Sequence, residues 1–152
     1  MKIVIGCGKA KRDHPAPADD LYTSAYFRCA IAWAKSVVSR DNVWIMSAKY
    51  GMVPAARVIA PYSASLSTAG FARTSEALEP PIPAHVLAQQ CINWRDPVIM
   101  LAGAKYYRLL SEAAPHLHPF NPFFPLLTDR RQGYQAQQMK LHHGRIPGMV
   151  AS

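Results

Sequence analysis

The segment VWIMSAKYGMVP, residues 43–54, contains the pattern on which the fold class depends. It begins with a short apolar run, Val43 to Met46, which is typical of a buried strand. A lysine and a tyrosine follow this run, and Gly51 then permits a tight turn. Polar side chains at the end of a buried strand are typical of the binding edge of an α/β sheet.

Two further segments show a similar arrangement. KIVIGCGKAKR, residues 2–12, predicts a strand from Lys2 to Gly6. VIMLAGAKYY, residues 98–107, continues a predicted strand from Pro97 to Leu101. A glycine and a lysine follow the strand in both segments, so three predicted strand ends have a related composition.

Segments with helical periodicity separate these strands. Apolar residues at helical spacing predict a helix from Ser24 to Ser39, and Pro83 is suited to open a second helix that runs to Trp94. Further helices are predicted over residues 104–113 and 132–143, the last one ended by Gly144. The alternation of strands and helices predicts an α/β fold, a single three-layer domain of 152 residues with a mainly parallel central sheet.

Three segments fit this order less well. RVIAPY, residues 57–62, is interpreted as a short strand, and residues 63–83 as a long polar loop. The proline-broken PHLHPFNPFFPLL, residues 115–127, is interpreted as an edge strand or a wrapping segment.

The charge of the chain indicates an anionic partner. Its 17 lysines and arginines and 9 aspartates and glutamates give a net charge of +8. This surplus favours nucleic acid and then phosphorylated small molecules. The predicted partner is nucleic acid, DNA more than RNA, or a nucleotide. No apolar run approaches the ~20 residues of a membrane helix, and the dispersed cysteines fit a reducing compartment. We expect a cytoplasmic protein without a membrane partner, and the sequence gives no indication of its oligomeric state.

The three strand ends predict one basic pocket. In open α/β sheets, ligands bind at the carboxyl ends of the strands. Glycines there let the backbone approach a phosphate, lysines supply charge, and tyrosines supply a stacking face. The alternative is a solvated lysine or a half-buried core tyrosine at each position. The predicted substrate- or phosphate-binding residues are Cys7, Gly8, Lys9, Lys11, Tyr22, Ser47, Gly51, Tyr62, Gly103 and Lys105.

The predicted catalytic residues are Asp20, Lys49 and Tyr50. Asp20 would orient a water molecule or stabilise positive charge on a sugar. Its alternative role is that of a helix-capping or ion-pairing aspartate. Lys49, together with Lys9 and Lys11, would hold phosphates, and Tyr50 or Tyr62 would stack on an extruded base.

Neither a cofactor nor a metal ion is expected. GCGKAK, residues 6–11, lacks the spacer and the Lys-Ser/Thr end of a P-loop, and it is not a dinucleotide fingerprint. His116 and His118 lack cysteine or acidic partners at ligand spacing.

Two segments resemble a known family. GCGKAKRDHPAPADDLYTSAYFR, residues 6–28, and WIMSAKYGMVPAARVIAPYSASL, residues 44–66, resemble a phage and bacterial family of small uncharacterised proteins that look like distant relatives of the YaaA family. A similar pattern occurs in a domain of archaeosine-type tRNA modification enzymes, whose fold resembles uracil-DNA glycosylases. The shared signature consists of Ser47, Tyr50, Gly51, Pro54, Pro61 and Tyr62.

This resemblance implies a uracil-DNA-glycosylase/YaaA-like fold and a nucleic-acid context, since YaaA-like proteins are associated with DNA binding and oxidative stress. It transfers no reaction, and residues 115–152 match it poorly. Together with the basic pocket, it predicts a nucleic-acid-acting protein, a DNA glycosylase-like or base-modifying enzyme. The alternatives are a non-catalytic DNA-binding protein and a small-molecule nucleotide binder.

Overall fold

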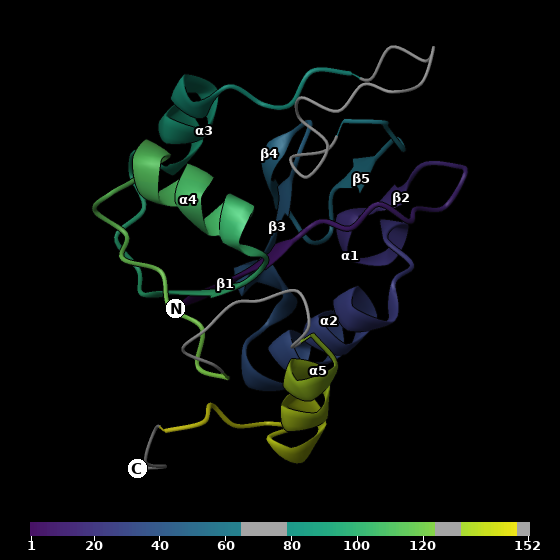
Figure 1. Cartoon of the computed structure of the whole chain (residues 1–152), viewed down its shortest axis with the longest axis vertical. Coiled ribbons are helices and arrows are strands. Elements are labelled where there is room, and N and C mark those ends of the chain that lie inside the picture. The colour runs from purple at the N-terminus through teal and green to yellow at the C-terminus, as the bar shows by residue number, and fades with distance from the viewer. Residues whose placement is uncertain (65–78, 124–131, 149–152) are drawn as a thin grey trace.

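A central sheet organises the computed structural model, which describes residues 1–64, 79–123 and 132–148 (Figure 1). Its strands, in the spatial order β4-β3-β1-β6, are β1 (Lys2–Gly6), β3 (Val43–Ser47), β4 (Gly51–Pro54) and β6 (Val98–Leu101). β1 runs parallel to both β3 and β6, whereas β4 runs antiparallel to β3. The prediction of an α/β domain with a mainly parallel sheet is therefore confirmed.

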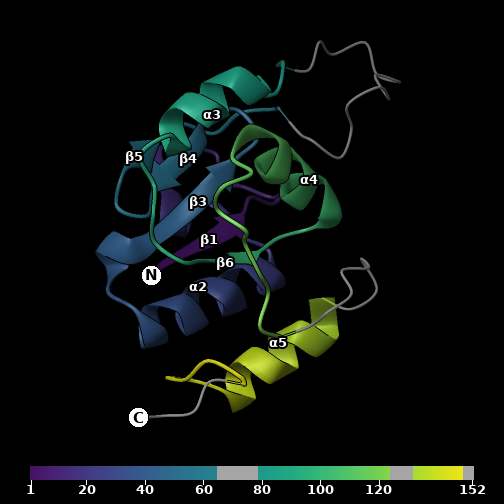
Figure 2. The same ribbon diagram turned by 90° about the vertical axis from the view of Figure 1, so that its left-hand side faces the viewer.

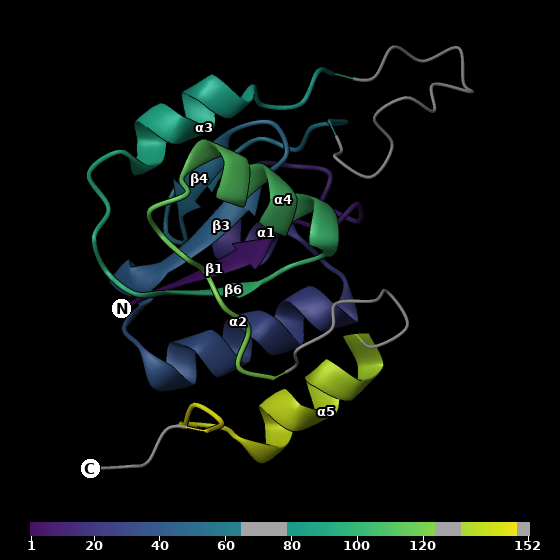
Figure 3. The ribbon, with the colours of Figure 1, turned by 60° about the vertical axis from the view of Figure 1, so that its left-hand side comes forward.

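Helices cover both faces of the sheet. α2 (Ala25–Val37) packs on one face, and α3 (Ala84–Cys91) and α4 (Ala104–Ala113) pack together on the other face (Figure 2). The sheet is thus the middle of three layers. α5 (Gln132–Leu141) packs on α2 (Figure 3), and its buried Met139 joins the core on the α2 side.

β1, which has a parallel neighbour on each side, shows why the apolar runs of the sequence predict buried strands. Successive side chains of a strand point to opposite faces. In β1, Ile3 and Ile5 join the core on the α2 side, whereas Val4 joins the core on the α3 and α4 side. All three side chains are fully buried. A parallel strand that is covered on both faces has to be apolar at every position.

The helix boundaries follow local capping chemistry. Ser24 caps α2, because its Oγ accepts a hydrogen bond from the Phe27 amide at 3.2 Å. α3 begins directly after Pro83 and ends earlier than predicted, at Cys91. α4 has the bounds that the sequence predicts. Gly144 follows α5 with a φ of 79°, which is the conformation expected of a glycine beyond a helix end.

Polar contacts hold α5 and the turn that follows it against α2. The indole nitrogen of Trp33 donates hydrogen bonds to the carbonyl oxygens of His142 and Arg145, at 3.1 and 3.0 Å. The hydroxyl of Tyr26 donates to Oε1 of Gln135 at 2.8 Å. Gln135 is buried, so this pairing satisfies a polar group that would otherwise be costly to bury.

The structure corrects the prediction at its shortest elements. β4 is a strand of four residues where only a turn was expected. The expected loop between β1 and α2 contains β2 (Ala16–Pro17) and the short helix α1 (Ala18–Leu21). β2 pairs antiparallel with β5 (Val58–Ile59), the remnant of the predicted short strand, and a 3-10 helix, η1 (Arg40–Asn42), precedes β3. Elements of two to four residues are too short to show a period in sequence.

The proline-broken segment wraps along β6. The amide of Met100 donates to the carbonyl of Phe120 at 2.9 Å, and the amide of Phe120 donates to the carbonyl of Val98 at 3.2 Å. Its last part, residues 124–127, lies outside the described residues, as does most of the predicted loop, residues 65–78. No helix in the described ranges combines the length and the apolar composition that a bilayer crossing requires.

Candidate functional site

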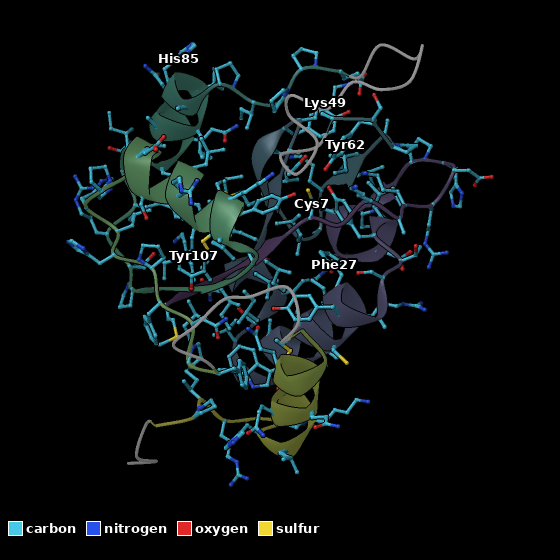
Figure 4. All side chains as sticks on the ribbon, viewed as in Figure 1. Cys7, Phe27, Lys49, Tyr62, His85 and Tyr107 are labelled. Atoms are coloured by element: carbon cyan, nitrogen blue, oxygen red, sulfur yellow. The ribbon has the colours of Figure 1, made fainter. Side chains whose placement is uncertain are left out.

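The carboxyl ends of the three parallel strands meet at one edge of the sheet, as the sequence predicts. Gly6 at the end of β1 pairs with Met46 of β3, and Ile5 pairs with Leu101 of β6. The chain leaves β1 toward α2 on one face and leaves β6 toward α4 on the other face. Such a divergence of neighbouring strands marks the place where α/β sheets bind ligands. Cys7, the first residue after β1, lies at this place (Figure 4).

Cys7 receives contacts from both neighbouring strand ends. Its Sγ accepts a hydrogen bond from the amide of Ala48 at 3.3 Å and lies 2.9 Å from the hydroxyl oxygen of Tyr106. The same hydroxyl is 3.2 Å from the carbonyl oxygen of Cys7, to which it can also donate. Tyr106 lies in the first turn of α4, so Cys7 joins all three parallel strand ends.

Ser47 explains the turn in the segment SAKYG. Its fully buried Oγ accepts hydrogen bonds from the amides of Lys49 at 3.2 Å and Tyr50 at 3.0 Å. The hydroxyl satisfies the amides that the end of β3 would leave unpaired. Ser47 also donates to the hydroxyl oxygen of Tyr62 at 2.8 Å. It therefore links the turn to the aromatic part of the site.

Gly51 completes the same turn. Its φ is 74°, and a Cβ at this position would lie 2.2 Å from Oε1 of Gln90 and 2.3 Å from Cδ1 of Ile82. Gln90 holds the turn from α3, since it accepts a hydrogen bond from the Met52 amide and donates one to the Tyr50 carbonyl. The positive φ and the lack of room for a Cβ explain why a glycine stands at position 51. Its predicted contact with a ligand stays a prediction.

Three tyrosines lie beside Cys7 and Ser47. Tyr22 and Tyr62 are buried and hydrogen-bonded to each other through their hydroxyls. The half-buried Tyr50 packs edge-on against Tyr62, with ring centroids 5.4 Å apart. Burial raises the pKa of Tyr22, Tyr62 and Tyr106 far above that of an exposed tyrosine, and the nearby Cys7 adds to this shift. Their hydroxyls therefore stay protonated at neutral pH.

Two predicted lysines lie over these rings. Nζ of Lys11 lies 4.5 Å from the ring centroid of Tyr62 and 5.7 Å from that of Tyr22. Nζ of Lys49 lies 5.2 Å from the ring centroid of Tyr50. An ammonium group over an aromatic face is attracted by the ring quadrupole. A base that stacks on Tyr50 or Tyr62 must use the opposite face or displace a lysine.

The two lysines differ in their charge partners. Lys49 forms an ion pair with Glu79 at 2.9 Å, and this hydrogen bond raises the pKa of Lys49. Glu79 also accepts a hydrogen bond from the Ser63 amide. Lys11 has no carboxylate partner among the described residues; its Nζ donates to the Lys9 carbonyl at 3.1 Å. Burial lowers the pKa of Lys11, and the electrostatic attraction of Cys7 opposes that shift.

The chain belongs to the DUF6884 family. The model of this family of unknown function matches residues 3–140, which include every strand end described above. No match to a curated protein or to a solved structure reaches significance. The remaining predicted site residues of this DUF6884 protein lie nearer its surface.

Asp20 lies on the exposed side of α1. Its carboxylate accepts a hydrogen bond from Nη2 of Arg12 at 3.0 Å, and 57% of its side chain is exposed. The neighbouring Asp19 is buried and paired with Lys35 at 2.8 Å and Arg40 at 2.7 Å. The structure thus places Asp20 in an ion pair outside the tyrosine cluster, and its catalytic role stays a prediction.

Gly8 and Gly103 are partly exposed, and the outer lysines of the predicted site are exposed. A Cβ added at Gly8 would make ordinary contact with Ser24, and one added at Gly103 would meet no atom within 4 Å. The side chains of Lys9 and Lys105 are exposed. The amide of Ala48 and its bond to Cys7 were not predicted, because a backbone donor leaves no signal in the sequence.

Proposed function

We propose that this DUF6884 protein acts on nucleic acid, binding a backbone phosphate and an extruded base at the carboxyl edge of its sheet. The observation that carries this proposal is the convergence of lysines and tyrosines at three parallel strand ends. Lys11 and Lys49 lie directly over the rings of Tyr62 and Tyr50. Phosphate next to a stacking surface is the combination that a nucleotide offers.

The geometry supports distinct roles for the two lysines. Lys11 is half-buried without a carboxylate partner, so a phosphate oxygen would supply the missing anion. Lys49 would exchange Glu79 for phosphate, and the free energy lost with this ion pair is small because both side chains are partly exposed. The half-buried Tyr50 offers the stacking face, because Tyr62 is buried.

The proposed reaction is of the DNA glycosylase-like or base-modifying kind. Three observations support it: the net charge of +8, the polar cluster around Cys7 at the strand ends, and the three-layer fold. A three-layer fold is what a uracil-DNA-glycosylase/YaaA-like protein would require. A base that leaves the duplex needs a pocket with an aromatic wall and polar groups that contact its edge.

Fluorescence anisotropy of labelled single- and double-stranded oligonucleotides across a salt series tests the proposal. We expect salt-sensitive binding that the double variant Lys11→Ala/Lys49→Ala weakens, with a salt slope lower by about one per lost phosphate contact. The matched control, Arg95→Ala/Lys140→Ala, removes the same charge away from the strand-end edge: Arg95 precedes β6, and Lys140 lies on α5.

Binding that both double variants weaken equally would contradict a specific edge and leave only a general charge effect. Absence of binding by the wild type at low salt would contradict a nucleic-acid partner. Oligonucleotides recovered after incubation are then analysed by mass spectrometry, and a released or altered base is the expected product.

A further inference from the structure

The surroundings of Cys7 set it apart from the other two cysteines. Cys91 is buried among apolar side chains, and burial raises its pKa to about 11. Cys29 is half-buried on α2 and packs against the apolar core. Among the described residues, a hydrogen bond to sulfur is found only at Cys7. A thiol becomes reactive where donors and positive charge stabilise its anion.

Two donors point at the sulfur of Cys7. The amide of Ala48 donates at 3.3 Å, and the hydroxyl of Tyr106 lies at 2.9 Å. The single proton of that hydroxyl serves either the sulfur or the Cys7 carbonyl oxygen at 3.2 Å. Once the sulfur is anionic, the charge-assisted bond is the stronger of the two. Because burial keeps Tyr106 protonated, this donor persists at neutral pH.

The ammonium group of Lys11 lies at the same cluster, 4.5 Å from the ring centroid of Tyr62. Lys11 is half-buried, and among the described residues it lacks a carboxylate partner. An anionic Cys7 would raise the pKa of Lys11, which burial lowers. Removing an ammonium group from water without an anion is costly. The rings of Tyr22 and Tyr62 and the Lys9 carbonyl surround this ammonium, and an anionic sulfur or a bound anionic ligand would neutralise its charge.

We propose that Cys7 is the nucleophile of the strand-end edge, activated by Lys11, Tyr106 and the amide of Ala48, and that it attacks an electron-poor ring carbon of a bound base. This inference deepens the proposed function and rests on it for the identity of the electrophile.

The step balances within the residues named. The thiolate sulfur forms a bond to the ring carbon, and the electron pair of that carbon's π bond moves to a ring nitrogen or carbonyl oxygen. The ammonium of Lys11 gives that atom a proton and becomes a neutral amine. The thiolate and ammonium charges thus disappear together, and reversal of these movements releases Cys7.

Alkylation by iodoacetamide tests the nucleophile without requiring nucleic acid. The sulfur displaces iodide from the methylene carbon, and peptide mapping by mass spectrometry gives a separate rate for each cysteine. At pH 7 we expect Cys7 to react about tenfold faster than Cys29. Lys11→Met should slow Cys7 about fivefold, whereas Lys11→Arg, which keeps the charge, should restore the rate.

Lys140→Met is the control, because it removes an exposed lysine on α5, away from the strand-end edge, and it should leave the rate of Cys7 unchanged. Circular dichroism confirms that each variant is folded. If folded wild-type Cys7 reacts no faster than Cys29, or if Lys140→Met slows it as much as Lys11→Met does, the inference is overturned.

A saturating oligonucleotide separates this inference from the proposed function. Slower alkylation of Cys7, with Cys29 unaffected, supports both. Fast alkylation of Cys7 that no oligonucleotide slows overturns the nucleic-acid proposal and supports the nucleophile. If the wild type binds the oligonucleotide but its Cys7 is alkylated slowly in the absence of nucleic acid, only the proposed role of Cys7 as nucleophile is overturned.

Discussion

Arg40 holds the buried carboxylate of Asp19 with two hydrogen bonds, at 2.7 and 2.9 Å, and thereby joins η1 to α1. Lys35 of α2 adds an ion pair to the same carboxylate at 2.8 Å. The segment that carries Tyr22 to the site is therefore anchored to the body of the domain by one aspartate. Replacement of such a group leaves its cationic partners without their anion.

We expect Asp19→Asn to lower the free energy of unfolding by about 2 kcal/mol, less than for a fully buried pair because Lys35 and Arg40 reach solvent. Urea denaturation measures this difference. Asp13→Asn is the control, since the Asp13 side chain is fully exposed, and it should leave the stability nearly unchanged. Equal effects of the two changes would show that Asp19 is no anchor.

The same ion pair predicts a dependence of stability on pH. Burial alone would raise the pKa of Asp19, but the hydrogen bonds from Arg40 and Lys35 outweigh burial and lower the pKa. A lowered pKa in the folded state stabilises the protein above the unfolded value near 4, and this contribution is lost as the pH falls through the folded pKa.

The stability difference between the wild type and Asp19→Asn should therefore be constant from about pH 7 to 5 and shrink below about pH 4. Denaturation curves of both proteins at several pH values measure it. A difference that stays constant down to pH 3 would argue against a charged Asp19.

Two glycines of the predicted site should respond differently to alanine. Gly51→Ala places a Cβ against Gln90 and Ile82 at a positive φ, and we expect a loss of about 2–4 kcal/mol. Gly103→Ala meets open space at the start of α4 and should cost less than about 1 kcal/mol. Thermal unfolding measures both.

Gly103→Ala also reports on the ligand. Its Cβ would occupy the open space beside the strand-end edge, so oligonucleotide affinity should fall while stability is kept. Unchanged affinity in this variant would place the ligand away from the start of α4.

Glu79 should oppose the binding of nucleic acid, because it neutralises Lys49. Glu79→Gln frees the ammonium group, and we expect the affinity for an oligonucleotide to rise about two- to fivefold at low salt. Glu112→Gln on the exposed face of α4 changes the net charge equally and serves as the control. If both variants gain the same affinity, Lys49 does not contact the phosphate.

Much of the fold follows from the sequence because β1, β3 and β6 are covered on both faces and consist mainly of apolar residues. Their parallel order, and hence the meeting of Cys7 with the ends of the other strands, follows from the alternation with helices. The short β4 leaves no comparable pattern. Its four residues include Pro54 and gain their place only by pairing with β3.

The details of the site depend on contacts that the sequence does not encode locally. Asp19 and Asp20 are neighbours of one type, and only the packing of α1 decides which carboxylate is buried. Ser47 and Tyr62 are far apart in the chain, and their hydrogen bond requires the whole path between them. Composition alone does not distinguish a lysine over a ring from a solvated one.

The antiparallel β4 carries the chain away from the strand-end edge, since Pro54 pairs with Trp44 near the start of β3. The residues between Pro54 and Tyr62 therefore have to return to the strand-end edge before Tyr62 can bond to Ser47. The pairing of β5 with β2 lies on this return path. The path has a fixed length with both ends anchored. We expect a residue inserted between Pro54 and Tyr62 to pull the aromatic ring out of place. The site thus restricts insertions and deletions between Pro54 and Tyr62, although the residues between these two lie outside the site.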